Sequence, residues 1–286
     1  MPSVSVSRGD DPRKTTREAL KRLGTSRIRN ARVLLKTDAA RPLSPETGEV
    51  THPEVISAAI DYFREKGAAD IAVGDSPVPG TSAEEAFRAS GLSEVARRKG
   101  VRLLDFDRSA DRDIAIPGGL RFKRLTATAL LNAFDFIVSM PVMRPHPQTG
   151  AALSYANLKG VMWGAQKLAL YRKDAEAGDV GHPSELDLAL ADLATAVRLD
   201  MVIIDGTVSM RGRGPAAGRE EIPGLVVAGT DPLAADMTAA RLMGIDPHKV
   251  PHLNLIAQQS VNRHGAVAIT PENYLEWRAA PAPVFA

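Results

Sequence analysis

Short apolar runs alternate with segments of helical period along most of this chain, and this alternation constrains the fold more than any other feature. The apolar runs are four to six residues long and lie at 31–35, 70–73, 101–104, 134–139, 201–204 and 225–228. Runs of this length between turn residues are typical of strands covered on both faces, as in parallel sheets. The alternation therefore predicts an α/β protein with a mixed or mostly parallel sheet flanked by helices.

Three segments carry clear helix starts. Thr51 and Glu54 have the spacing of a capping box, and apolar residues then recur at helical period until Gly67. Ser184 is the expected cap of a helix that runs to 198, and Asp231 with the following proline begins a helix to 243. We also expect helical turns at 15–23, at 82–99 with a break at 91, at 125–132 and at 157–162, a β excursion at 114–123 and a loop at 210–221.

The length of 286 residues suits one large domain or two modest ones. No linker or change of composition divides the chain, so we expect a single α/β domain over 1–286. An N-terminal arm over about 1–28 precedes its first expected strand, and a subdivision near 125–150 is the alternative.

Composition excludes several classes of function. Without cysteine, the chain has no disulfide, thiolate nucleophile or cysteine-held iron–sulfur cluster. A net charge of +2 is too small for a dedicated nucleic-acid surface. No apolar run approaches the ~20 residues of a membrane helix, and the first residues lack the apolar core of a secretory signal. We therefore expect a cytoplasmic protein without nucleic-acid or membrane partners, and a homo-oligomer, most simply a dimer, because closed dimers are the commonest soluble assemblies.

The stretch from 140 to 164 follows an expected buried strand and concentrates reactive side chains between glycines and prolines. It contains Arg144, His146, Asn157 and Lys159. A histidine titrates near working pH and can serve as acid, base or metal ligand, an arginine fork binds carboxylates or phosphates, and a lysine can bind an anion or act as a base. A loop histidine, a surface ion pair and a solvated lysine are the structural alternatives.

Further candidates follow other strands or begin helices. Asp75, with Ser76 beside it, and Asp205 come directly after expected strands, where carboxylates orient histidines, take protons or cap the next turn. His52 and His182 each precede a proline at a helix start, where the helix dipole favours the neutral imidazole.

A glycine-rich segment and two aromatic residues complete the set. Gly212–Gly218 lets backbone N–H groups approach an anion, with Arg213 adding charge, although its spacing is neither a dinucleotide fingerprint nor a P-loop. Tyr155 and Trp163 flank the central stretch and are candidates for an aromatic wall or for core packing. The remaining histidines, at 248, 252 and 264, are expected to form a surface group.

The order of these segments resembles the uncharacterised bacterial and archaeal family known as domain of unknown function 362. The matching pieces are VLLK at 33–36, residues 51–76, FDFIVSMPVMRPH at 134–146, NLKG at 157–160, His182, LDMVIIDG at 199–206, GRGPAAG at 212–218 and residues 229–246. The chain departs from the family pattern where members usually carry lysines, with Val142 and Arg144 before His146, and with Ala156 before Asn157. Many relatives carry a ferredoxin-like cluster domain, which a cysteine-free chain cannot form.

Three functional hypotheses follow. The favoured one is an enzyme that performs acid–base chemistry, as an isomerase, a lyase or a bond-cleaving enzyme, on an anionic or carbonyl-bearing small molecule, aromatic ones included. A hydrolase or redox enzyme with a divalent metal on histidine and aspartate ligands is the first alternative, and a non-catalytic ligand-binding or redox-accessory protein is the second. The proposed catalytic residues are His146, His182, Asp75, Asp205 and Lys159, and the substrate-binding ones are Arg144, Asn157, Ser76, Tyr155, Trp163 and Arg213.

Overall fold

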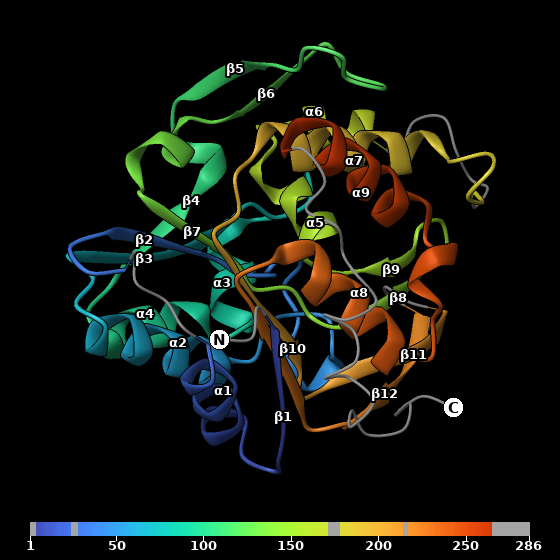
Figure 1. The fold of residues 1–286 in the computed structure, drawn as a ribbon. Coiled ribbons are helices and arrows are strands. Elements are labelled where there is room, and N and C mark those ends of the chain that lie inside the picture. Colours follow the sequence, from blue (N-terminus) through green and yellow to red (C-terminus); the bar gives the residue numbers. More distant parts are fainter. Residues whose placement is uncertain (1–3, 24–27, 171–177, 214–216, 265–286) are drawn as a thin grey trace.

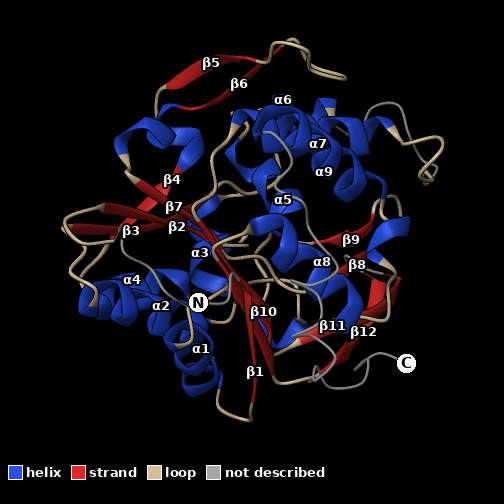
Figure 2. Cartoon of the chain, in the orientation of Figure 1, coloured by secondary structure: helices blue, strands red, loops and turns tan. Residues whose placement is uncertain are grey.

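A computed structural model describes residues 4–23, 28–170, 178–213 and 217–264. Its centre is a seven-stranded sheet in the order β1-β13-β10-β7-β2-β3-β4 (Figures 1 and 2). The strands are β1 (Val4–Arg8), β13 (Leu225–Gly229), β10 (Met201–Gly206), β7 (Phe136–Ser139), β2 (Arg32–Lys36), β3 (Asp70–Asp75) and β4 (Arg102–Asp105).

Strand directions confirm the predicted fold class. The five strands from β10 to β4 pair in parallel, and β13 pairs antiparallel with both β10 and β1. Strands from before residue 125 and after residue 150 share this one sheet. The protein is therefore an α/β protein with a mostly parallel sheet.

The N-terminal segment, predicted as an arm, contributes an edge strand and a helix to the fold. β1 pairs with β13 over its whole length, and α1 (Pro12–Lys21) packs against α2 (Pro53–Glu65) and β13. The sequence of β1 alternates valine with Ser5 and Ser7, both of which are buried. Because two of its three buried positions are serine, the strand carries no apolar run to reveal it.

Helices cover both faces of the sheet (Figure 1). On one face lie α1, α2, α3 (Ala83–Ala89) and α4 (Leu92–Lys99); on the other lie α5 (Ser154–Asn157), α7 (Glu185–Ala196), α8 (Pro232–Leu242) and α9 (Pro251–His264). Side chains of a strand alternate between faces, so Val33 and Leu35 of β2 belong to the core under α1–α4, whereas Leu34 belongs to the core under α7. Both faces are buried, as the apolar runs predicted.

Most expected helix boundaries agree with the structure. Ser184 caps α7 in a full capping box with Asp187, and Asp231 caps α8 through the N–H of Ala234. The helix expected at 51 begins one residue later, because His52 is its cap and accepts from Glu54 through Nδ1 at 3.1 Å. The Thr51 hydroxyl instead donates to the carbonyl of Met140 at 2.6 Å, which ties the start of α2 to the segment after β7.

Two predictions for segments outside the central sheet are wrong. The helix predicted at 125–132 is the second strand of a hairpin, β5 (Asp111–Ala115) with β6 (Arg124–Thr128), followed by a short 3-10 helix, η3 (Ala129–Ala133). Leu125 and Ala127 are buried while Thr126 between them is partly exposed, the alternation of a strand. The loop predicted at 210–221 contains the hairpin of β11 (Ser209–Arg213) and β12 (Ala217–Glu221).

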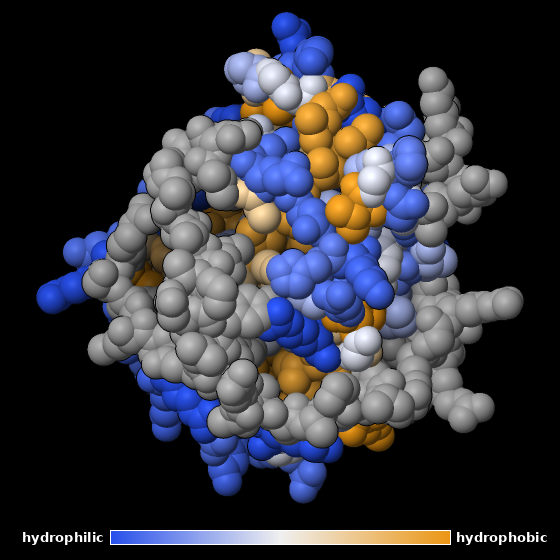
Figure 3. Space-filling model, turned by 45° about the vertical axis from the view of Figure 1, so that its right-hand side comes forward, coloured by the Kyte–Doolittle hydropathy of each residue, from blue (hydrophilic) through white to orange (hydrophobic). Residues whose placement is uncertain are grey.

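Figure 3 shows hydrophilic side chains over much of the described surface on one face, with apolar side chains gathered in hollows between them. Within the described residues, no helix combines the length and apolar character needed to span a bilayer.

Candidate functional site

The candidate site lies where the connections of the sheet change direction. After β2 the chain builds β3 and β4 on one side, and then returns to build β7 and β10 on the other. Ligands of open α/β sheets bind at such a point, outside the carboxyl ends of the strands. The segment after β7 adds the hairpin of β8 (Arg144–His146) and β9 (Gly150–Ala152), then α5 and η4 (Leu158–Val161), above these strand ends.

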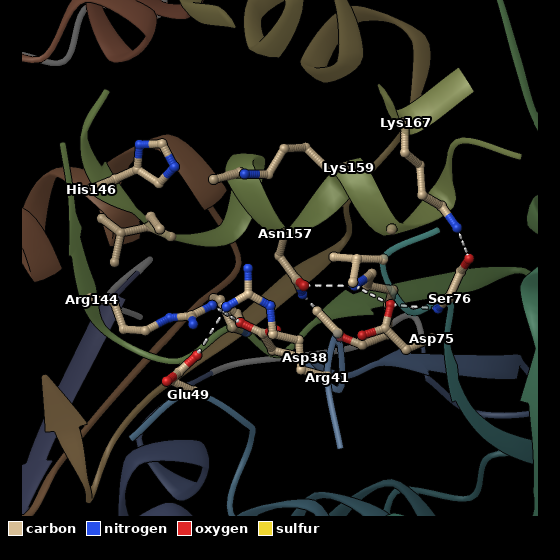
Figure 4. Close-up of a pocket in the computed structure, with 18 of the residues that line it drawn as sticks. Asp38, Arg41, Glu49, Asp75, Ser76, Arg144, His146, Asn157, Lys159 and Lys167 are labelled. Atoms are coloured by element: carbon tan, nitrogen blue, oxygen red, sulfur yellow. Dashed lines mark hydrogen bonds and ion pairs between the residues drawn. The ribbon is translucent and has the colours of Figure 1, made fainter. Parts of the chain in front are cut away.

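A cavity of about 440 Å³ occupies this place (Figure 4). That volume is within the range of sites that enclose whole small-molecule ligands, about 300–1,000 Å³. Five cations and three carboxylates line it, which favours a negatively charged ligand. Its polar lining consists of Lys36, Arg41, Arg144, Lys159, Lys167, Asp38, Glu49, Asp75, Ser76, His146 and Asn157.

A buried ion pair forms the floor of the cavity. The ammonium of Lys36 is 2.6 Å from Asp75 Oδ1 and donates to Asn157 Oδ1 at 2.6 Å and to the carbonyl of Thr37 at 2.8 Å. These three acceptors use all three of its protons. Burial raises the pKa of Asp75, and the Lys36 charge opposes that shift. A Cβ on Gly160 would lie 2.5 Å from Asp75 Oδ1, so only glycine lets η4 approach the pair.

Asn157 connects this floor to β7. Its amide nitrogen donates to the carbonyl of Lys36 and to Ser139 Oγ, and its oxygen accepts from the Lys36 ammonium. Both amide protons are therefore engaged within the protein. Asn157 lines the cavity, but its bonds are those of a positioning residue.

His146 is held as a neutral imidazole with one defined tautomer. Its Nδ1 accepts from the backbone N–H groups of Gln148 and Thr149, each at 3.3 Å, so the proton of the neutral ring resides on Nε2. Burial, helped by the charges of Lys159 and Arg144, lowers the pKa of His146 to about 3. Figure 4 shows the Lys159 side chain extending toward the imidazole. His146 thus offers the cavity a hydrogen-bond donor and stays uncharged at neutral pH.

Two carboxylates lie near Arg144 at the same end of the cavity. Arg144 pairs with Asp38 at 2.5 Å, with both side chains largely buried. Glu49 lines the cavity beside them, 3.9 Å from Arg41. Burial raises the pKa of Glu49, although both arginines oppose the shift. A partly buried carboxylate whose pKa is raised is a stronger proton acceptor than an exposed one.

At the opposite end, Lys167 is held by its own partners. Its ammonium donates to Ser76 Oγ, to the carbonyl of Pro77 and, at 2.7 Å, to Asp107 Oδ2. Ser76 Oγ in turn donates to Asp107 at 2.5 Å. Asp107 neutralises Lys167, so the excess positive charge of the cavity lies at the His146 end.

Other sequence candidates lie outside the lining. The Asp205 carboxylate accepts from the N–H of His52 and from Thr207. It therefore caps the turn that follows its strand, which was the structural alternative given for it in the sequence. Tyr155 packs in the core under α7, and Trp163 donates its indole N–H to the carbonyl of Ser109. The His182 side chain is 94% exposed beside Asp179. A histidine so open to solvent is not brought to the cavity.

The remaining candidates concern the C-terminal half. The side chain of Arg213 lies outside what the structure describes, so its role stays a prediction. The expected surface position of His252 is wrong: the residue is fully buried, with Nδ1 3.3 Å from Asp187. Helical period would have revealed it, because His252 stands on the apolar face of α9 with Leu253 and Ile256. His264 lies among the side chains that the structure leaves undescribed.

Five polar residues of the cavity lining were not among the sequence candidates: Lys36, Asp38, Arg41, Glu49 and Lys167. Lys36 and Asp38 end the first strand of the parallel sheet, and that position was the available signal. Glu49 and Lys167 lie in irregular segments, and only the tertiary fold brings them to the cavity. Among the described residues, no group of three or more histidine, aspartate or glutamate side chains is placed to hold a metal ion.

Fold and cavity together define an α/β protein with a ligand site at the carboxyl ends of its parallel strands. Residues 33–241 match the family described as "Domain of unknown function (DUF362)", and the chain belongs to this family, as the resemblance predicted. The "Thylakoid-associated protein sll1697" of Synechocystis sp. is 27% identical over 221 residues, which cover 77% of this chain and 65% of that protein. The chain thus spans less than two thirds of this relative.

The fold also occurs in solved structures. The lactate racemase apoprotein from Thermoanaerobacterium thermosaccharolyticum superposes with a TM-score of 0.55 and 16% identity, over 84% of this chain and 57% of that one. At this identity the likeness concerns the architecture alone.

Proposed function

We propose that this protein is an enzyme that transfers protons on a small carbonyl-bearing acid, with His146 as hydrogen-bond donor and Glu49 as base. The observation that carries the proposal is the neutral His146, whose Nδ1 accepts two backbone N–H groups and whose ring lines a positively charged cavity. A neutral histidine that polarises a carbonyl while a nearby glutamate removes a proton is an established catalytic arrangement.

In the proposed reaction, the C–H bond next to the substrate carbonyl breaks. Its proton passes to the Glu49 carboxylate, and its electron pair forms the C=C bond of an enolate. The Nε2–H of His146 donates to the oxygen, where negative charge develops. Return of a proton from Glu49 to the same carbon re-forms the carbonyl and completes an exchange. Where that carbon also carries a hydroxyl, the intermediate is an enediolate; Glu49 then protonates the former carbonyl carbon, the hydroxyl proton passes to the former carbonyl oxygen, and a new carbonyl forms at the neighbouring carbon, which completes an isomerisation.

Cationic side chains hold the substrate carboxylate in this proposal. Arg144 lies between His146 and Glu49, and Lys159 extends toward His146 from the other side (Figure 4). Their positive charge also helps to keep His146 neutral. Lys36, Asp75 and Asn157 act as positioning residues beneath them. The lactate racemase that shares the fold is named for a small hydroxy acid, and we propose hydroxy and oxo acids of this kind as the substrate class because the cavity is lined by cations.

Solvent exchange tests the proposal directly. A 2-oxo acid such as 2-oxobutanoate is incubated with the protein in deuterium oxide, and loss of the C3 proton signal is followed by proton NMR. The protein is expected to accelerate the loss of this signal above the rate measured without protein. Because Glu49 must be ionised and its pKa is raised, the rate should fall on the acid side with an inflection above the ordinary pKa of a glutamate.

Matched variants identify the groups. Glu49→Gln and His146→Gln should each lower the exchange rate at least 100-fold, the usual size of an acid–base contribution. Glu94→Gln, which alters a glutamate outside the cavity lining, should leave it unchanged. Exchange that persists in Glu49→Gln would exclude Glu49 as the base, and binding without exchange would favour a carrier.

A further inference from the structure

Apolar side chains line the part of the cavity next to Lys167, and we call this part the apolar compartment. Val78 and Pro79 follow Ser76 closely, and Leu168 follows Lys167 directly; all three line the cavity. Leu168 is 43% exposed. Exposed leucine surface at a cavity mouth is buried again when a ligand covers it.

Charge distinguishes the two ends of the cavity. At the His146 end Arg144 is paired with Asp38 and Arg41 lies 3.9 Å from Glu49, and Lys159 adds a further positive charge. At the other end Lys167 is paired with Asp107 and donates to Ser76. An anionic group therefore gains more at the His146 end, and the Lys167 end suits an uncharged group. Figure 4 shows His146 and Lys167 on opposite sides of the cavity.

The volume of the cavity also favours a ligand with an uncharged part. A three-carbon acid has six non-hydrogen atoms and would leave most of the 440 Å³ unfilled, since cavities of this size enclose drug-sized ligands. The unfilled part would be the compartment of Val78, Pro79 and Leu168.

We infer that the substrate is an amphipathic acid, with its carboxylate and carbonyl at the His146 end and an apolar chain or ring of four or more carbons against Val78, Pro79 and Leu168. This inference rests on the proposed function for the position of the acid group. It assigns to Leu168 a role in specificity, because this residue covers the apolar part of the ligand.

A homologous series of acids tests the inference. The dissociation constants of pyruvate, 2-oxobutanoate, 2-oxohexanoate and 2-oxooctanoate are measured by calorimetry with the full-length protein. Burial of each methylene should tighten binding about threefold to fourfold, so 2-oxooctanoate, with five more carbons than pyruvate, should bind about 240-fold to 1,000-fold more tightly. Equal affinities along the series, or tighter binding of inorganic phosphate than of any of these acids, would overturn the inference.

Two serine variants locate the compartment. Leu168→Ser should weaken binding of 2-oxooctanoate at least fivefold and leave pyruvate unchanged. Leu120→Ser is the matched control, because Leu120 is 45% exposed and lies outside the cavity lining; it should change neither. An equal loss for both acids in Leu168→Ser would contradict the assignment.

Binding and exchange separate this inference from the proposed function. The chain-length trend is read from dissociation constants, which need no turnover. A preserved trend without exchange would reject the enzyme and keep the ligand class, whereas exchange without the trend would reject the ligand class alone.

Discussion

At the scale of single residues, the hydrogen bonds around His146 decide its chemistry. Two backbone N–H groups point at Nδ1, and a protonated ring would place a third N–H against them. The ring is also buried near two cations. The residue is therefore a donor through Nε2 and a poor general base, which narrows the several roles that the sequence allowed.

This setting predicts a pH dependence of stability that His146→Asn should remove. The folded pKa of about 3 lies below the ordinary 6.5, so the unfolded chain binds more protons between these values and stability falls as the pH falls from 6.5 toward 3. At pH 5 this effect lowers the free energy of unfolding by about 2 kcal/mol. Urea unfolding at pH 7 and pH 5 should show that the wild type loses about 2 kcal/mol more than the variant, whose amide oxygen can accept the same N–H groups.

Comparison with the variant also separates His146 from other buried groups. Burial raises the pKa of Asp236 to about 7. The protonated form of Asp236 therefore adds to the free energy of unfolding at low pH, and this stabilisation is lost as the pH rises through 7. This opposite trend is present in the wild type and in His146→Asn alike, so it cancels when the pH-dependent loss of one is subtracted from that of the other. Equal losses in the two proteins would show that the folded imidazole can take up a proton.

Sequence reasoning named several residues that line the cavity, because strand ends are visible in the sequence. Asp75, Arg144, His146 and Lys159 were found for that reason, each at or after the end of an apolar run. His182 was misplaced, since a proline and a helix start do not reveal whether a loop faces solvent. Glu49 was missed because the loop that carries it has no periodic pattern.

At the scale of elements, buried carboxylates that accept backbone N–H groups position the segments around the sheet. Asp236 of α8 accepts from the N–H groups of Ser154 and Tyr155 at the start of α5. Asp192 of α7 accepts three N–H groups, from residues 120, 121 and 122, which lie between β5 and β6. Neither contact has a signature in the sequence, because each joins segments that are far apart along the chain.

Asp192 should therefore control the attachment of the β5–β6 hairpin to α7. In Asp192→Ala, three N–H groups lose their acceptor, and each unpaired buried group costs about 1–3 kcal/mol before relaxation. The loop lies at the surface, so water replaces much of this loss and the main effect is local opening. Hydrogen exchange should accelerate at least tenfold in 118–124 and remain unchanged in β2 and β7.

Asp246→Ala is a suitable control, because Asp246 accepts one N–H at the start of a 3-10 helix away from this hairpin. Unchanged exchange over 118–124 in Asp192→Ala would mean that the β5–β6 pairing alone holds the loop.

Elements with regular apolar patterns were predictable, and those defined by pairing were less so. The parallel strands and α2, α7 and α8 follow from periodicity and capping residues. β1 and the β5–β6 hairpin depend on partners supplied by distant segments, and short polar strands carry little signal of their own. The same limit applies to the β11–β12 hairpin.

At the scale of the whole molecule, the Lys36–Asp75 pair joins the two halves of the structure. Lys36 and Asp75 end two strands from the first half of the chain, and Asn157 and Gly160 belong to the segment that covers the cavity from the second half. Both charged side chains are at most 2% exposed. The floor of the cavity is thus a buried charge pair, and each charge is stabilised by the other.

A double-mutant cycle should reveal this dependence. Lys36→Met leaves the Asp75 carboxylate buried without its cation and should lower the free energy of unfolding by about 3–5 kcal/mol. Adding Asp75→Asn removes the uncompensated charge, so the double variant should be more stable than Lys36→Met alone, by at least 1 kcal/mol. The exposed pair Glu94–Arg97 provides the control cycle, in which no coupling is expected. If Lys36→Met and the double variant unfold at the same denaturant concentration, the two charges do not support each other, and the floor of the cavity is held by packing and by the hydrogen bonds of Asn157 instead.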